Sequence, residues 1–188
     1  MHRLGDYTIE RPKADDALGM LHAHQEAFVQ GYAREDGLYG ATREALTEFV
    51  HGEFEERRGQ HWLHEASHAR TGLWIARHLP TNEVVGLSAG VEESKSVTHI
   101  DSLYVSPEHQ GKGLGRELLR CTIADFVTAR VRLDVVQDTA AIEFYRHLGF
   151  VITTSLLLPP EPPKEYGITL MPFEMVLRRT RKTLVLAA

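Results

Sequence analysis

Residues 97–115 read VTHIDSLYVSPEHQGKGLG, and this stretch decides the fold that the sequence predicts. Its first half is rich in β-branched and aromatic residues and ends at Ser106-Pro107, which is typical of a strand followed by a turn. Apolar residues then recur at three- and four-residue spacing, which predicts a helix with one apolar stripe. The residues of that stripe are Leu119, Ile123, Phe126 and Val127.

The loop between this strand and helix predicts an anion site. Gly111, Gly113 and Gly115 stand at alternate positions where the chain enters the helix. The unpaired N–H groups and dipole of a helix N-terminus favour an anion, and glycines let a bulky anion approach the backbone. Neither a Walker loop nor a G-x-G-x-x-G dinucleotide fingerprint is present. A plain glycine-rich turn is the alternative, and the order strand, loop, helix disfavours it.

Length and composition indicate one soluble α/β domain over residues 1–188, with a basic and apolar tail at 178–188. The chain is 43% hydrophobic and 25% charged, and it has no apolar run long enough to cross a bilayer. A net charge of −5 weighs against nucleic acid as a partner and suits a cationic substrate. Cys121 is the only cysteine, so we expect a packed thiol and no intrachain disulfide. Because the sequence shows neither an apolar signal core nor a run that could span a bilayer, we expect a cytoplasmic location.

Elsewhere the apolar pattern alternates between strand and helix periods. Gly and Pro clusters separate the predicted elements. We expect strands at 7–10, 73–78, 84–91, from 131, at 151–158 and at 168–177. We expect further helices from Asp15 or Asp16 (with Leu18, Leu21, Phe28 and Tyr32), from Thr42 to Phe54, and at 139–148.

Two segments resemble one known family. Residues 110–115, with the strand ending Leu103-Tyr104-Val105-Ser106-Pro107 before them, fit the pattern Gln/Arg-x-x-Gly-x-Gly/Ala. Residues 138–150 fit Asn-x-x-Ala-x-x-Phe-Tyr…Leu-Gly-Phe, except that Asp138 replaces the asparagine. Both are similar to segments of the GCN5-related N-acetyltransferases, the GNAT superfamily. The resemblance implies a mixed sheet of about six to seven strands, splayed at the cofactor site and flanked by about four helices.

The resemblance also implies an activity. The protein is expected to transfer the acetyl group of acetyl-CoA, without a metal, to a primary amine of a small molecule or peptide. Tyr145 matches the family's general acid, and a backbone N–H near Val105 matches its oxyanion donor. A tyrosine merely packed on the core is the alternative for Tyr145. The implied cofactor-binding residues are Leu103, Tyr104, Val105, Gln110, Gly111, Lys112, Gly113, Leu114, Gly115, Arg116 and Asp138.

The general base is expected on the first strand of the quoted stretch. The family often has a glutamate six residues before the valine that ends this strand, and here His99 stands there. Histidine suits the task because its ordinary pKa is about 6.5. Asp101 lies two residues on, so both side chains should share one sheet face and Asp101 could orient the ring. Loss of the proton to water is the alternative.

Other interpretations stay open. A non-catalytic acyl-CoA-binding module would share the same loop. His64-Glu65-Ala66-Ser67-His68 satisfies the zinc-peptidase pattern H-E-x-x-H, with Glu92 or Glu93 as a distant third ligand, although surface histidines explain it as well. The proline-rich residues 159–164 form either a stiff loop or a border of the acceptor pocket. The tail either frays or pairs with a second subunit in a homodimer.

Overall fold

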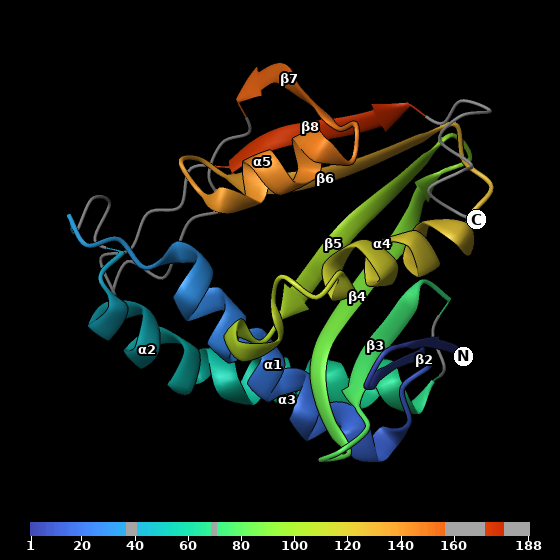
Figure 1. Ribbon diagram of the computed structural model, residues 1–188. Coiled ribbons are helices and arrows are strands. Elements are labelled where there is room, and N and C mark those ends of the chain that lie inside the picture. The colour runs from blue at the N-terminus through green and yellow to red at the C-terminus, as the bar shows by residue number, and fades with distance from the viewer. Residues whose placement is uncertain (37–40, 69–70, 157–171, 179–188) are drawn as a thin grey trace.

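The computed structural model describes residues 1–36, 41–68, 71–156 and 172–178, which form one mixed sheet with helices on both faces (Figure 1). The strand order is β1-β2-β3-β4-β5-β6-β8-β7. The strands are β1 (His2–Leu4), β2 (Tyr7–Glu10), β3 (Leu73–His78), β4 (Glu83–Ser94), β5 (Val97–Val105), β6 (Arg130–Val136), β7 (Val151–Leu156) and β8 (Pro172–Arg178). The helices are α1 (Ala17–Tyr32), α2 (Arg43–His51), α3 (Glu53–Ser67), α4 (Leu114–Ala124) and α5 (Ala140–His147).

The predicted α/β class and mixed sheet are confirmed, with slightly more elements than expected. The described residues hold 8 strands and five α-helices. The additional strand β1 has 3 residues, which is too short for a strand period to show in the sequence. The helix expected from Thr42 to Phe54 ends at Gly52, where α3 begins. None of the described helices is long and apolar enough to cross a membrane.

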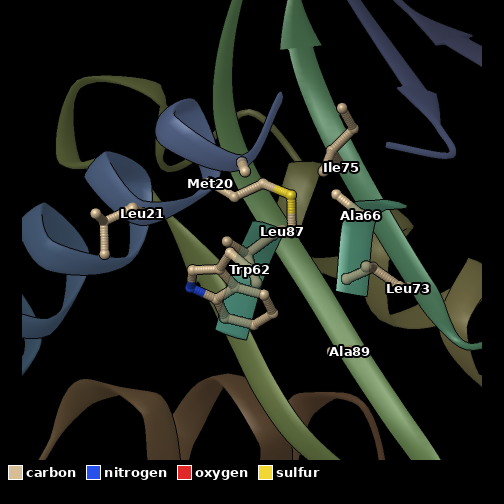
Figure 2. Packing of buried hydrophobic residues seen from close by; sticks show 9 residues of the cluster. Met20, Leu21, Trp62, Ala66, Leu73, Ile75, Leu87 and Ala89 are labelled. Atoms are coloured by element: carbon tan, nitrogen blue, oxygen red, sulfur yellow. The ribbon is translucent and has the colours of Figure 1, made fainter. Parts of the chain in front are cut away.

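One face of the sheet is covered by α1 and α3. Trp62 of α3 and Met20 of α1 are both fully buried against Leu87 of β4 (Figure 2). Burying an aromatic or large aliphatic side chain contributes about 1.5–3 kcal/mol, so this cluster anchors both helices. Leu18 was predicted to lie on the buried apolar face of this helix, and that prediction is wrong because the residue is 62% exposed.

The opposite face is covered by α4 and α5. Leu114, Leu118 and Cys121 of α4 are buried against the strands from β2 to β5. The predicted apolar stripe of α4 extends too far, because the helix ends at Ala124 and Val127 is 97% exposed. Asp125 explains the early end, since its carboxylate turns back to the sheet, accepting from Gly72 N (2.8 Å) and Trp74 Nε1 (2.9 Å).

The sheet opens between β5 and β6. These parallel strands pair only from Val97↔Arg130 to Ile100↔Leu133. Beyond that point β5 continues to Val105 beside β4 alone, and β6 continues to Val136 beside β8. Figure 1 shows the two strands diverging. The expected splay is therefore present at the strand that the sequence singled out.

A bulge in β5 lies next to this opening. Ala89 pairs with Ser102, whereas Gly90 pairs with Ile100, so Asp101 is the additional residue. Ala89 packs with α1 and α3, whereas Ile100 packs with α4 and α5. The bulge therefore reverses the alternation of side chains along β5 at Asp101.

Candidate active site

The loop before α4 keeps its backbone donors available. Gly111 has a φ of +72° and Gly113 one of +83°, a left-handed conformation that favours glycine. Gly113 is the N-cap of α4 and supplies no side-chain acceptor to the first turn. The side chain of Gln110 closes the preceding turn by donating from Nε2 to the Val105 carbonyl at 2.9 Å. An exposed helix N-terminus of this kind suits a pyrophosphate.

The next residues of the loop have different tasks. Leu114 is 1% exposed and packs in the core, so only its backbone faces the loop. A Cβ at Gly115 would lie 3.4 Å from Phe144 Cζ, an ordinary van der Waals distance, so this position of α4 lies beside α5. Of the three glycines expected to serve the anion, Gly111 and Gly113 have left-handed backbones and Gly115 lies in the first turn of α4.

Lys112 is held against the side of the loop. Its ammonium donates to the Tyr7 hydroxyl (3.0 Å) and the Glu108 carbonyl (2.9 Å). The same hydroxyl lies 3.0 Å from His109 Nδ1. Burial lowers the pKa of His109, and the charges of Lys112 and His78 lower it further, which favours the neutral ring at neutral pH. Arg116 on the first turn of α4 is exposed, which leaves it accessible to a phosphate.

The side chains at the end of β5 point alternately to the two faces of the sheet. Leu103 and Val105 pack toward α4, whereas Tyr104 turns toward α1. The Tyr104 ring stacks on His24 with centroids 3.9 Å apart, and its hydroxyl hydrogen-bonds with Tyr32. Burial raises the pKa of Tyr104 and Tyr32, so both hydroxyls keep their protons at neutral pH.

Tyr145 lies across the opening on α5. It is 8% exposed and packs with Ile100, Leu133 and Phe150. Burial raises the pKa of Tyr145, and the proximity of Tyr32 adds to the rise. The hydroxyl therefore stays protonated at neutral pH and is able to donate. Four-residue spacing from Phe28 predicts Tyr32 only as an apolar-face residue of its helix, so sequence reasoning missed its place near Tyr145.

His99 lies on the other face of the sheet, at the base of the opening. Its Nε2 is 3.5 Å from Oδ2 of Asp134 on β6. We expected Asp101 to orient this ring, but the bulge interrupts the alternation on which that expectation rested. Asp134 was missed, although it occupies a polar position of a strand whose Val131, Leu133 and Val135 alternate as buried residues.

Asp138 fills a backbone requirement. It is exposed and has a φ of +59°, directly before Thr139 at the start of α5. Asparagine and aspartate are the residues other than glycine that adopt this conformation most readily. The change from the family's asparagine therefore preserves the turn.

The zinc-peptidase pattern lies at the end of α3. The His64 and His68 rings are 4.3 Å apart, and His68 Nδ1 donates to the His64 carbonyl at 2.7 Å. Both histidines are exposed, and within the described ranges no group of three or more His, Cys, Asp or Glu could hold a metal. These observations favour surface histidines.

A groove of about 1070 Å³ runs along α1 and meets the loop at residues 106–109. Its walls carry both signs of charge, including Glu26, Arg43 and Glu83. Arg77 in this groove is held by Glu10 (2.8 Å) and Asp16 (2.7 Å). The groove adjoins the loop but does not include its glycines or Tyr145 among the residues that line it.

Known proteins match this fold and the segments that carry the site. The model of the "Acetyltransferase (GNAT) family" matches residues 36–150. The peptidyl-lysine N-acetyltransferase YjaB of Salmonella typhimurium is 31% identical over 115 residues, which are 60% of this chain and 69% of that protein. The L-amino acid N-acyltransferase MnaT of Escherichia coli is 39% identical over 70 residues, 35% of this chain and only 39% of that protein.

A solved structure extends the likeness over nearly the whole chain. The PaiA N-acetyltransferase of Thermoplasma acidophilum, crystallised with coenzyme A, has a TM-score of 0.67 and 15% identity, covering 92% of this chain and 99% of the other. At that identity the likeness concerns the fold. Together with the family match over residues 36–150, the open sheet and the glycine loop lead to one conclusion. This chain belongs to the GNAT family of acetyltransferases.

Proposed function

We propose that this protein is an N-acetyltransferase that transfers the acetyl group of acetyl-CoA to a primary amine. One observation carries the proposal: a loop with left-handed Gly111 and Gly113 opens α4 beside the strand at which the sheet splits. The backbone N–H groups of the loop would bind the pyrophosphate, and Arg116 and Lys112 would add positive charge. The edge of β5 from Leu103 to Val105 pairs with no other described strand on the β6 side, so its main-chain groups, apart from the Val105 carbonyl that accepts from Gln110, would face the pantetheine amides.

Two side chains would move protons, from opposite faces of the opening. His99, or Asp101 beside it, removes a proton from the incoming ammonium group, so that the free amine can attack the thioester carbonyl. Tyr145 would donate a hydrogen bond and then its proton to the departing thiolate, and its raised pKa means that the hydroxyl still carries the proton at neutral pH. The N–H near Val105 would stabilise the oxyanion.

The acceptor is proposed from the names of the relatives. YjaB is named for peptidyl-lysine and MnaT for L-amino acids, and both kinds of acceptor present an amine. We therefore propose a primary amine of a small molecule or a peptide. No role for nucleic acid or a membrane is proposed.

The test is thiol release from acetyl-CoA with a panel of L-amino acids, lysine peptides and diamines. We expect release above the background hydrolysis for at least one of these classes. A protein that binds acetyl-CoA tightly but releases no thiol with any class would instead be a non-catalytic binding module. Metal analysis of the purified protein separates both from a zinc hydrolase.

The assembly and location are also proposals. We propose one catalytic domain over residues 1–188, acting in the cytoplasm as a homodimer. The proline-rich residues 159–164 and almost all of the tail at 178–188 lie outside the described residues. Light scattering of the full chain and of a chain ending at Arg178 tests the dimer, because loss of the tail should yield monomers if the tail pairs.

A further inference from the structure

The geometry points to Asp134 as the positioning residue for His99, holding its ring so that one particular nitrogen receives the proton of the amine. The inference rests on the proposed function, in which His99 is the base. The two residues come from adjacent parallel strands. His99 pairs with Arg132, and Asp134 follows Leu133, the last residue of β6 paired with β5. Asp134 therefore stands at the point where the sheet opens.

The two oxygens of Asp134 face different partners. Oδ2 lies 3.5 Å from His99 Nε2, and Oδ1 accepts from Arg132 Nη1 at 3.3 Å. The His99 contact is long for a hydrogen bond, and such contacts often tighten when substrate binds. Because Arg132 holds one oxygen, the other is turned toward the imidazole.

Arg132 is itself fixed in place. Its Nε and Nη2 donate to the two oxygens of Glu93 at 2.6 and 2.8 Å, a bidentate pair that joins β4 to β6. The charged groups around His99 thus come from every neighbouring strand. Glu93 on β4 and Arg132 and Asp134 on β6 lie near the ring, and Glu174 on β8 acts on Arg132. Of these groups, Asp134 is the one whose carboxylate oxygen faces the His99 ring, at 3.5 Å.

This arrangement selects the tautomer of the neutral ring. An Nε2–H that faces the Asp134 carboxylate leaves the lone pair on Nδ1. Nδ1 then accepts the proton of the ammonium group, the amine keeps the electron pair for the thioester, and the resulting imidazolium donates from Nε2 to Asp134. The proximity of His99 is also the largest cause that lowers the pKa of Asp134, so the carboxylate is ionised at neutral pH.

Asp134→Asn tests the tautomer directly. Arg132 Nη1 is a donor and needs an acceptor, so the amide oxygen of the variant would face Arg132. The amide nitrogen would then face His99 and donate to Nε2. The neutral ring would then carry its proton on Nδ1, where the lone pair is needed. We expect ¹⁵N NMR near pH 8 to show Nε2–H in the natural protein and Nδ1–H in the variant, with His99→Ala identifying the signal. In the assay kcat should fall about tenfold to hundredfold, more than the KM for the amine changes.

Three further variants complete the experiment. Asp134→Glu should restore the Nε2–H tautomer and part of kcat. Glu92→Gln removes an exposed carboxylate that neighbours Glu93 in sequence. This control should change neither the tautomer of His99 nor kcat. The inference is overturned if the Nδ1–H form dominates in the natural protein, if Asp134→Asn leaves the tautomer unchanged, or if Asp101→Asn shifts it instead. If the enzyme is active but His99 does not change from Nε2–H to Nδ1–H in Asp134→Asn, this inference is wrong and the proposed function stands. If the tautomer changes as expected but the protein has no activity, only the proposed function is wrong.

Discussion

Gly113 combines a left-handed backbone with an exposed position, and the two effects can be separated. We expect Gly113→Val to weaken CoA binding more than tenfold, because a β-branched residue at a φ of +83° would distort the donors of the loop. The distortion should cost about 1–2 kcal/mol of unfolding free energy, so the fold remains. Calorimetric titration with CoA and urea denaturation measure the two effects.

Gly5 supplies a matched control for that substitution. It has a φ of +57°, and no atom lies within 4 Å of the point that a Cβ would occupy. Gly5→Val should therefore lose stability like the Gly113 variant and bind CoA normally. Equal CoA affinity in the two variants would remove the loop from the binding site.

Tyr145 is predicted to act on turnover rather than on cofactor affinity. Tyr145→Phe keeps the packing against Phe150 but removes the hydroxyl that would donate to the thiolate. We expect kcat to fall at least about tenfold, while the Kd for CoA changes less than about twofold. Single-turnover measurements establish whether chemistry limits the rate. An unchanged single-turnover rate would leave Tyr145 with a packing role.

At the scale of elements, Asp125 ties the end of α4 to β3. Its carboxylate accepts from Gly72 N, from Trp74 Nε1 and from Arg11 Nη2 at 2.7 Å. Asp125→Ala would leave two partly buried donors without an acceptor, so we expect a loss of about 2–3 kcal/mol in unfolding free energy. Urea denaturation is the measurement.

Arg11→Ala is the control for Asp125. It removes the ion pair but leaves the carboxylate with its two N–H donors, and the Arg11 side chain is 39% exposed. We expect a loss of about 1 kcal/mol, part of it from the guanidinium that stacks 4.1 Å from the Trp74 ring centroid. Losses of the same size in both variants would show that the N–H bonds to Asp125 contribute little.

The predictable elements were those with a strong local pattern. The hairpin of β3 and β4 and the succession β5, loop, α4 follow from alternation, turn residues and glycines that lie close together in the chain. The split at Gly52 and the bulge at Asp101 depend on packing between distant segments. For this reason the prediction from local periodicity made the helix from Thr42 too long. It also treated the alternation of side chains in β5 as unbroken.

The same distinction applies to the site. The glycine loop and Tyr145 belong to contiguous motifs, so the sequence pointed to them. Asp134 becomes a neighbour of His99 only through the register of two parallel strands that are joined by α4. Tyr32 on α1 comes near Tyr145 on α5 only through the tertiary fold. A single sequence does not specify such a register, so these residues could not be found from it.

At the scale of the whole molecule, the sheet separates two chemical environments. Leu103 and Tyr145 pack with α4 or α5 on one face, whereas His99 and Asp134 lie on the other. The strands part beyond Ile100 and Leu133, next to His99 and Asp134. In the proposed function the cofactor and the amine therefore approach from opposite faces and react at the opening.

The packing of α1 and α3 on the sheet buries His24 of α1 against Trp62 of α3 and Tyr104 of β5. This burial makes the unfolding free energy depend on pH. His24 is 1% exposed, Trp62 Nε1 donates to its Nδ1 at 3.3 Å, and Tyr104 stacks on its ring. Burial lowers the pKa of His24 to about 3, with smaller contributions from the charges of Arg58 and His61. The ring is therefore neutral in the folded protein across the physiological range.

The sign of the effect follows from proton binding. An unfolded histidine takes up a proton near pH 6.5, whereas folded His24 does so only near pH 3, so acid favours the unfolded chain in this window. His24 should lower the unfolding free energy by up to about 1.4 kcal/mol per pH unit as the pH falls below 6.5.

In His24→Gln, whose amide can still accept from Trp62, this part of the pH dependence should vanish. The difference in unfolding free energy between the natural protein and this less stable variant should therefore shrink from pH 7.5 to 4.5. His22→Gln, an exposed neighbour on α1, should run parallel to the natural protein in urea denaturation. A His24→Gln curve that also stayed parallel would mean that His24 takes up its proton in the folded protein as readily as in the unfolded one.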